Sequence, residues 1–403
     1  MRVPALTGSV FGLAIVLAAC TGTNNAGRNG PIAEFSAAAP VTPVQSQPLD
    51  GTNTTDQIGT GPIRIALILP LTQASGPSVI GASLRNAAEL ALAEGGSNDV
   101  TLLIKDDHST PDGARAAVQA ALSEGAELVL GPVFAPNVRE AGRVARGAGK
   151  PMIAFSSDTS TAGTGSYLLS FPIEGYVDRI VDYAASKGKK SIAALIPDSD
   201  YGRISEAQLQ QAAARRGLRV LTIEHYQPQT MAPAVQKIAA LGGQIDTLFI
   251  PEQTEATPAV AQALAANGLD GKRVQILGTG QWNDPRVQKL PALQGAWFAA
   301  AETEGFNAFA QKYRGKFGTD PQRLATTGYD AVTLAVALAR TQGSQRYSEG
   351  VLTNTKGFIG TDGFFRFRPD GQIDRGLAVF QIKNGFAAPI SQAPRSITSA
   401  SAN

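Results

Sequence analysis

The stretch from Ile63 to Glu94 decides the fold, because it has the pattern of one strand, one loop and one helix. It begins with Ile63-Arg64-Ile65-Ala66-Leu67-Ile68-Leu69, a nearly continuous apolar run of the kind required of a strand buried on both faces of a parallel sheet. Pro70 ends the run, and apolar residues then recur at helical spacing from Ile80 to Ala91. Ligands of open α/β sheets bind at the loops that leave the carboxyl ends of strands. The loop at residues 71–77 is therefore one predicted wall of a binding site.

The same strand and helix unit recurs along the chain. Short apolar runs are followed by helical patterns, and Thr110 before Pro111 has the position of an N-cap residue. Repeated βα units predict parallel sheets with right-handed crossovers, and two sets of units predict an α/β protein with two Rossmann-like lobes. The predicted strands are residues 100–104, 128–130 and 152–155 in the first set, and 191–196, 220–223, 246–250 and 274–277 in the second.

The C-terminal part does not start a third domain. Aromatic residues from Phe306 to Phe317 mark an amphipathic helix, and residues 331–338 are apolar on nearly every face, as in a buried helix. Both helices need a sheet to cover, and the first lobe has one available. Residues 363–367 and 377–382 predict a β-hairpin, and residues 389–403 predict a disordered tail.

The first twenty residues predict a targeting segment. Arg2 supplies a positive charge, an apolar stretch follows, and Leu17-Ala18-Ala19-Cys20 resembles the lipobox of bacterial lipoproteins, whose cysteine is lipidated. An ordinary signal peptide with an incidental cysteine is the alternative. Because Cys20 is the only cysteine, neither a disulfide nor a cysteine-based site is expected. Residues 21–61 predict a flexible tether, and Thr21 after the cysteine slightly favours the outer membrane.

Composition limits the classes of function. The chain has 403 residues, of which 43% are hydrophobic and 17% charged, so it can bury the cores of two domains. The formal net charge is +2, and the basic residues are scattered among 33 acidic ones, so no basic stripe suggests nucleic acid. No other apolar run approaches membrane-spanning length, and membrane contact is expected through the lipid anchor only.

Several short strings carry a resemblance to a known family. Each string alone is weak, but their order and spacing over residues 62–386 are similar to those of type I periplasmic binding proteins, the leucine-binding family of solute receptors. The strings are Ile65-Ala66-Leu67-Ile68-Leu69-Pro70-Leu71, Asp106-Asp107, Gly131-Pro132-Val133, Pro151-Met152-Ile153, Pro197-Asp198-Ser199-Asp200-Tyr201-Gly202 and Tyr329-Asp330-Ala331-Val332.

The resemblance implies two lobes joined by three chain crossings, with a ligand held between the lobes and a hinge that closes on it. It implies a lipid-anchored periplasmic receptor that passes a small polar, amino-acid-like ligand to an ABC-type permease, without cofactor or enzymatic activity. The crossings are expected near Phe171, residues 300–302 and residues 357–360. The expected parts are a signal peptide (1–20), a tether (21–61), a first lobe (62–172 and 301–358), a second lobe (173–300 and 359–388) and a tail (389–403).

Carried over position by position, the resemblance implies ligand contacts in the first lobe. Ala135, beside Phe134, stands where a hydroxyl residue usually holds the ligand carboxylate, and it has no hydroxyl. Asp158, after Ser156 and Ser157, replaces a frequent threonine. Asp158 either holds a ligand ammonium group or caps the following turn, and the hydroxyl cluster is either a binding loop or a solvated one.

Three further contacts are implied from the second lobe. Tyr201 matches a tyrosine that lines the family's cleft, and Gln281 or Trp282 lies near the position of an acidic residue that pairs the ligand ammonium. The alternative is that the two aromatic residues lie in the core or on the surface of the lobe.

Two other functions have some support in the sequence. The strings Phe155-Ser156-Ser157-Asp158, Gly278-Thr279-Gly280-Gln281-Trp282 and Gly295-Ala296-Trp297-Phe298 resemble a lipoprotein branch of the same fold that activates penicillin-binding proteins, which would make a peptidoglycan synthase the partner. For an enzyme, Asp106-Asp107-His108 is the only candidate cluster, but strand-end solvation and helix capping explain it better, because neighbouring residues of a strand point in alternating directions.

Overall fold

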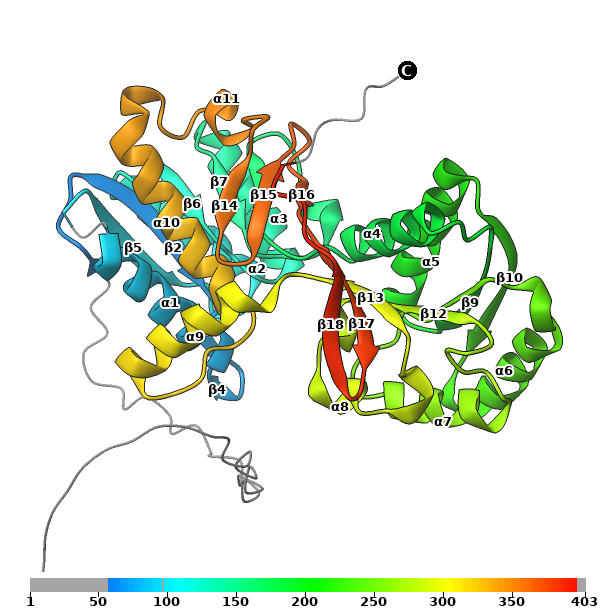
Figure 1. Ribbon diagram of the computed structural model, residues 1–403. Coiled ribbons are helices and arrows are strands. Elements are labelled where there is room, and N and C mark those ends of the chain that lie inside the picture. The colour runs from blue at the N-terminus through cyan, green and yellow to red at the C-terminus, as the bar shows by residue number, and fades with distance from the viewer. Residues whose placement is uncertain (1–56, 96–97, 397–403) are drawn as a thin grey trace, which may run out of the picture. The chain divides into compact units, whose positions relative to one another are not determined.

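The computed structural model describes residues 57–95 and 98–396, and Figure 1 shows their arrangement. The predicted signal peptide, Cys20 and most of the tether lie outside the described residues. The end predicted for the tether is wrong. Residues 57 and 58 form a strand that pairs with Leu102 and Leu103, so the folded region begins before residue 62.

The first sheet has six strands, of which all but the first run parallel. Alternate residues of its central strand pack on opposite faces: Leu67 and Leu69 contact the core under α1 and α10, whereas Ala66 and Ile68 contact the core under α2 and α3. This arrangement confirms the prediction of a strand buried on both faces. In spatial order the strands are β1 (Gln57–Ile58), β5 (Val100–Asp106), β2 (Ile63–Leu69), β6 (Leu128–Leu130), β7 (Met152–Ala154) and β8 (Ser166–Leu168).

Helices from both ends of the chain cover the first sheet. The late helix α10 packs against α1, so the prediction that the C-terminal helices cover this sheet is confirmed. Thr110 caps α2 through its side chain, which accepts a hydrogen bond from the Gly113 amide, as predicted. The helices are α1 (Val79–Gly95), α2 (Pro111–Ser123), α3 (Ala135–Gly147), α9 (Thr303–Phe317), α10 (Ala325–Thr341) and the short α11 (Glu349–Leu352).

The second sheet has seven strands and is mixed. Five strands are parallel, which confirms the predicted parallel βα arrangement, and the last two run antiparallel at one edge. In spatial order the strands are β10 (Arg219–Tyr226), β9 (Ser191–Pro197), β11 (Thr247–Phe249), β12 (Gln275–Gly278), β13 (Trp297–Ala300), β17 (Ala378–Lys383) and β18 (Phe386–Ser391). Its helices are α4 (Ile173–Ser186), α5 (Asp200–Arg216), α6 (Met231–Ala240), α7 (Thr257–Ala266) and α8 (Pro285–Gln288).

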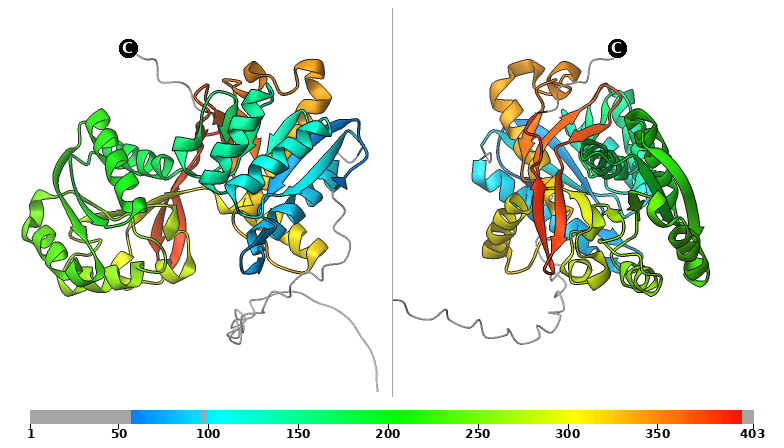
Figure 2. Two further views of the ribbon diagram at one scale, coloured as in Figure 1. Left: turned by 180° about the vertical axis from the view of Figure 1, so that it is seen from behind. Right: turned by 45° about the vertical axis from the view of Figure 1, so that its right-hand side comes forward.

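The end of the chain forms a separate three-stranded sheet and then the last two strands of the second sheet, as the orange and red segments in Figure 2 show. The predicted hairpin has a different second strand: β15 (Gly363–Phe367) pairs with β16 (Ile373–Arg375) and with β14 (Phe358–Gly360). Phe365, Phe367 and Ile373 belong to the core of the first sheet, because they bury apolar surface against it. The lobe boundary and the crossing expected near residues 357–360 are therefore wrong, and the chain passes to the second sheet at residues 376–377.

The predicted disordered tail is also wrong over part of its length. Residues 386–391 form β18, which pairs with β17 although Pro389 lies within it. The strand is fixed further by Arg179, whose guanidinium donates a 2.7 Å hydrogen bond to Ser391 Oγ. An edge strand tolerates proline because one side of its backbone needs no partner. Residues 397–403 lie outside the described part of the chain.

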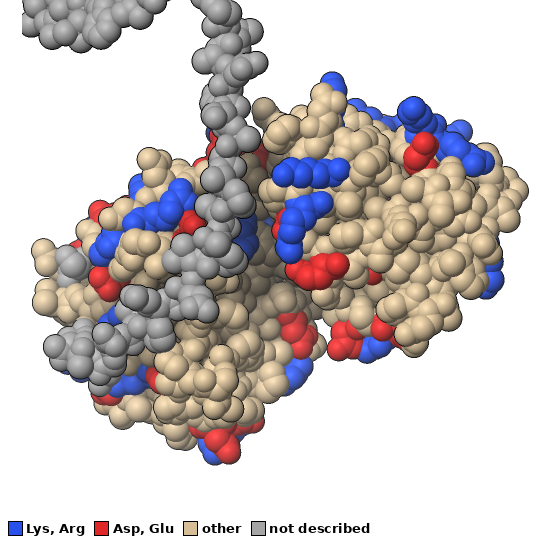
Figure 3. All heavy atoms as spheres, turned by 90° about the horizontal axis from the view of Figure 1, so that it is seen from below, with Lys and Arg blue, Asp and Glu red and all other residues tan. Residues whose placement is uncertain are grey.

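None of the helices within residues 57–95 and 98–396 is long and apolar enough to cross a membrane. On the face drawn in Figure 3, acidic and basic side chains alternate with uncharged ones, and no area of one sign dominates. This distribution agrees with the scattered charges of the sequence.

Candidate functional site

The carboxyl ends of the strands in both sheets face the segments that connect the sheets. In the first sheet β8 runs parallel to β7, and the chain leaves it for α4 through Phe171 and Pro172. In the second sheet β13 runs parallel to β12, and the chain leaves it for α9 through residues 301–302. Ligands of open α/β sheets bind at these carboxyl ends. The connecting segments, which we call the hinge, are residues 169–172, 301–302 and 376–377.

The predicted first-sheet residues Phe134 and Ala135 lie where strand β6 gives way to helix α3. Phe134 is the N-cap residue, makes no side-chain capping bond and is 37% exposed. Ala135 is the first helical residue and has only a methyl group to offer. This turn therefore presents apolar surface, without the hydroxyl that a carboxylate ligand would need there.

The loop after β7 uses its polar groups internally. Asp158 caps the short helix η1 (Thr159–Thr161), since its Oδ1 accepts hydrogen bonds from the amide and the hydroxyl of Ser160 at 3.0 and 2.6 Å. Its Oδ2 accepts a 3.0 Å hydrogen bond from Arg139. Ser156 is buried and accepts from the Asp158 amide, while Ser157 is exposed. Of the two roles considered for Asp158, the capping role is present, and ligand binding stays a prediction.

The predicted second-sheet residues separate into two groups. Tyr201 lies in the first turn of α5 and donates a 2.8 Å hydrogen bond to Thr279 Oγ1. This bond joins the end of β9 to the end of β12. Burial raises the pKa of the Tyr201 phenol. Gln281 is exposed, and its backbone oxygen accepts from Thr254. Trp282 is 0% exposed and belongs to the core beneath the sheet. Its indole packs against Gly278 and other core residues, so the core alternative for Trp282 is present, and its contact with a ligand stays a prediction.

Glu174, in the first turn of α4, was missed by the sequence reasoning. Its Oε1 accepts a 2.7 Å hydrogen bond from Thr159, so it ties the first-sheet loop to the first helix beyond the hinge. Its Oε2 is buried and has no hydrogen-bond donor among the described residues. No cation of the described chain lies within salt-bridge distance of it. A buried carboxylate oxygen without a donor is unusual and is available to a ligand.

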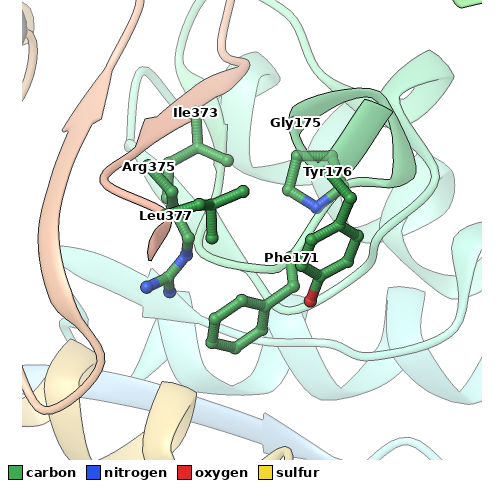
Figure 4. Close-up of a pocket in the computed structure, with 7 residues that line it drawn as sticks. Phe171, Gly175, Tyr176, Ile373, Arg375 and Leu377 are labelled. Carbon is green, nitrogen blue, oxygen red and sulfur yellow. The ribbon is translucent and has the colours of Figure 1, made fainter. Parts of the chain in front are cut away.

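Arg375, at the end of β16, was missed as well. Its Nε donates a 2.6 Å hydrogen bond to the backbone oxygen of Ser170, and its guanidinium lies 4.0 Å from the centroid of the Phe171 ring. Its Nη1 and Nη2 are buried without an acceptor among the described residues. Figure 4 shows Phe171 between Arg375 and Tyr176, beside a small cavity of about 10 Å³, which is room for one water molecule. Burial raises the pKa of Tyr176 to about 12, so this phenol stays neutral.

A charged pair, Arg323 and Asp362, lies beside the hinge. Arg323 donates to both carboxylate oxygens of Asp362, at 2.6 and 3.1 Å, and its guanidinium lies 4.9 Å from the centroid of Phe171. Asp330 accepts two hydrogen bonds from Thr361 at Oδ1, while its buried Oδ2 has no donor. Burial raises the pKa of Asp330 to about 6. Two guanidinium groups, those of Arg323 and Arg375, thus lie over the ring of Phe171 in the hinge, and Asp362 pairs with the first of them.

Unpaired polar atoms are concentrated at this hinge. Of nine buried side-chain nitrogen and oxygen atoms without a hydrogen-bond partner in the described residues, five belong to Ser170, Glu174, Asp330 and Arg375. Each such atom lowers the free energy of unfolding by about 1–3 kcal/mol. Several of them on neighbouring segments therefore indicate a functional role, or a bound partner that supplies the missing hydrogen bonds. The free carboxylate oxygen of Glu174 suits a cation, and the free nitrogens of Arg375 suit a carboxylate.

The acidic cluster after β5 has a structural role. Asp106 accepts hydrogen bonds from the amides of Leu71 and His108, at 3.0 and 2.8 Å, and Asp107 accepts from Ser109 and Asn137. These contacts give the cluster a structural role, but strand-end solvation does not describe Asp107, which is 0% exposed, and the helix is capped by Thr110. Within the described ranges no group of three or more His, Cys, Asp or Glu residues is placed to hold a metal ion.

Comparison with known proteins agrees with the two-sheet arrangement. Residues 62–387 match a family model described as periplasmic binding protein. A solved branched-chain amino acid ABC transporter protein from Rhodospirillum rubrum is similar, with a TM-score of 0.71 and 20% identity over 81% of this chain and 99% of that one. No curated protein matches the chain.

Two further solved structures contain ligands. A substrate-binding protein of an ABC transporter from Desulfitobacterium hafniense, in complex with Leu, has a TM-score of 0.61 and 18% identity over 81% of this chain and 99% of that one. A solute-binding protein from Rhodopseudomonas palustris, in complex with 3,4-dihydroxybenzoic acid, has a TM-score of 0.56 and 20% identity over 83% of this chain and 98% of that one. At these identities the likeness concerns the fold.

Proposed function

This chain belongs to the periplasmic binding protein family, and we propose that it is the solute receptor of an ABC-type transporter, which holds an amino-acid-like ligand at the hinge between its two lobes. The observation that carries the proposal is Glu174, whose buried Oε2 lacks a donor. A ligand ammonium group supplies both the missing hydrogen bond and the opposite charge, which makes a strong contact in a site of low dielectric constant. The receptor itself performs no reaction.

The ligand carboxylate is assigned to the same region. The Nη1 and Nη2 atoms of Arg375 offer the parallel donors that a carboxylate accepts in a bidentate contact. This contact replaces the hydroxyl that Ala135 lacks. The ligands of the two similar proteins, leucine and 3,4-dihydroxybenzoic acid, both carry a carboxylate. Because the unpaired atoms of Glu174 and Arg375 are buried, ligand entry requires movement at the hinge.

The location and partner follow from the family and from the N-terminal sequence. Lipidation at Cys20 would hold the receptor at a bacterial membrane facing the periplasm, with the outer membrane slightly favoured, and the residues before 57 would tether it. Its partner is then an ABC permease. This anchor is testable by mass spectrometry of the mature N-terminus, where acyl chains on Cys20 are expected.

Titration calorimetry with the twenty amino acids and their desamino analogues tests the proposed ligand class. Leucine and 4-methylpentanoate form a matched pair, since they differ only in the ammonium group. We expect an amino acid to bind and its desamino analogue to bind about tenfold more weakly or worse, the loss of one charge-assisted contact. Glu174→Gln is expected to remove this preference. Glu304→Gln, which changes an exposed acid in the first turn of α9, is the matched control.

Different results of this titration would contradict different parts of the proposal. If no amino acid or carboxylic acid gives heat of binding or raises the unfolding temperature, the receptor function fails. If a solute binds with equal affinity to Glu174→Gln, the function stands and the ammonium contact is wrong. The second candidate, regulation of a peptidoglycan synthase, rests on the resemblance at residues 155–158, 278–282 and 295–298, and recovery of a penicillin-binding protein by the full chain from envelope extract would favour it.

A further inference from the structure

A second cavity lies away from the hinge, on the flank of the first sheet. It has a volume of about 400 Å³, within the range of small-molecule sites, and lies between α3 and the loop at residues 160–164. It is lined by Arg139 and Arg146 of α3, which are both exposed, and by residues of the loop, among them Ser160, Thr161 and Thr164. No acidic residue lines it.

The two arginines differ in how their charge is balanced. Arg139 donates to Asp158 and to Ser160, both at 3.0 Å, so a neighbouring carboxylate partly neutralises it. Arg146 donates at 2.7 Å to the neutral hydroxyl of Ser166, and no carboxylate of the described chain lies within salt-bridge distance of it. The cavity therefore keeps a net positive charge, which is concentrated at Arg146.

The geometry of α3 holds Arg146 in this position. Residues 139 and 146 are seven apart and lie on one face of the helix, with a rise of about 10 Å between them. Gly142 lies one turn before Arg146, and a Cβ at this glycine would come within 3.0 Å of the Arg146 Nη1 atom and the Ser166 hydroxyl. The absence of a side chain at residue 142 leaves space for the guanidinium to lie across the helix towards Ser166.

We propose that this cavity binds a small hydroxylated oxyanion, with the anionic group on Arg146 and the ligand hydroxyls against the loop at residues 160–164. A phosphate monoester and a carboxylate share this chemistry, since a guanidinium binds both through parallel N–H donors. The site is separate from the solute position, because its charged groups lie on α3, whereas Glu174 and Arg375 lie at the hinge. It does not depend on the proposed receptor function.

Glycerol 3-phosphate, glycerate and glycerol form a matched series for calorimetric titration into the full chain at constant ionic strength. We expect the first, the second or both to bind saturably, with a Kd of about 1 mM or lower, and glycerol not to bind. The relative affinity of the two anions identifies the preferred group. Arg146→Met is expected to weaken anion binding about tenfold.

Arg143→Met is the matched control, since Arg143 lies on the same helix, is exposed and pairs with Glu140 outside the cavity. Its anion affinity should stay within about twofold of that of the unmodified chain. The proposal is overturned if glycerol binds as well as the anions, if no anion binds saturably, or if the two arginine variants lose affinity equally.

Discussion

The loop at residues 156–160 and the hinge around Phe171 are joined by the hydrogen bond from Thr159 to Glu174, yet they use their polar groups in opposite ways. In the loop, both carboxylate oxygens of Asp158 have donors within the fold. Near the hinge, carboxylate oxygens of Glu174 and Asp330 and two nitrogens of Arg375 are buried without hydrogen-bond partners in the part of the chain that the structure describes. A buried polar group that has its hydrogen-bond partners within the fold stabilises the fold. A buried polar group without a partner lowers stability and is available to a ligand.

The second sheet extends this comparison. Its turn at residues 279–282 pairs Tyr201 with Thr279, as the loop at residues 156–160 pairs its polar groups. It also buries Trp282 completely, and the indole Nε1 has no hydrogen-bond partner among the described residues, so only the hydroxyl pair resembles that loop. The comparison thus predicts that changes in the two strand-end loops reduce stability, whereas changes at the hinge alter ligand binding or the pH dependence of stability.

The largest effect is expected for Trp282→Ala. Removing a fully buried indole leaves a cavity in the core of the second sheet, and the free energy of unfolding should fall by about 3–5 kcal/mol. Gln281→Ala, which changes an exposed neighbour, should alter it by less than about 0.5 kcal/mol. Urea unfolding measures both. A Trp282→Ala variant of unchanged stability that fails to bind solute would instead make Trp282 a ligand contact.

A pH-dependent effect is expected at the hinge. Burial raises the folded-state pKa of Asp330 from 3.8 to about 6, so folding favours its protonated form. The resulting stabilisation is present below pH 3.8 and is lost as the pH rises through about 6. Relative to Asp330→Asn, which carries no titrating group, the free energy of unfolding of the unmodified chain should fall by up to about 3 kcal/mol between pH 4 and pH 7. Parallel stability profiles of the two proteins would contradict this assignment.

The smallest effect is expected for Tyr201→Phe. It removes one hydrogen bond to Thr279 and leaves the ring, so the free energy of unfolding should fall by about 1 kcal/mol. Thr279→Val should cost a similar amount, and the double variant should cost less than the sum, because both remove the same bond. If the costs add fully, the two side chains act independently. A further loss of solute affinity in Tyr201→Phe would place this hydroxyl in the ligand site.

Much of the fold could be predicted because local patterns carry it. The apolar run at residues 63–69, the N-cap at Thr110 and the repeated βα units predicted strands and helices that the structure contains. The main errors concern residues 357–391, where β15 and β16 pack against the first core and β17 and β18 then join the second sheet. A strand pattern shows that one face is apolar, but it does not show which of two available sheets will cover that face.

The sequence by itself determined the α/β class, the two sets of βα units, the family resemblance and the lipobox-like Cys20, since each depends on residues that are close in the chain. Only the tertiary structure decided which buried polar groups have hydrogen-bond partners. Glu174 and Arg375 are 201 positions apart in the numbering, and nothing local marks either residue. The cavity on α3 likewise depends on the approach of the loop at residues 160–164 to Arg146. Whether a buried charge has a partner depends on distances in space, which residue spacing along the chain does not specify.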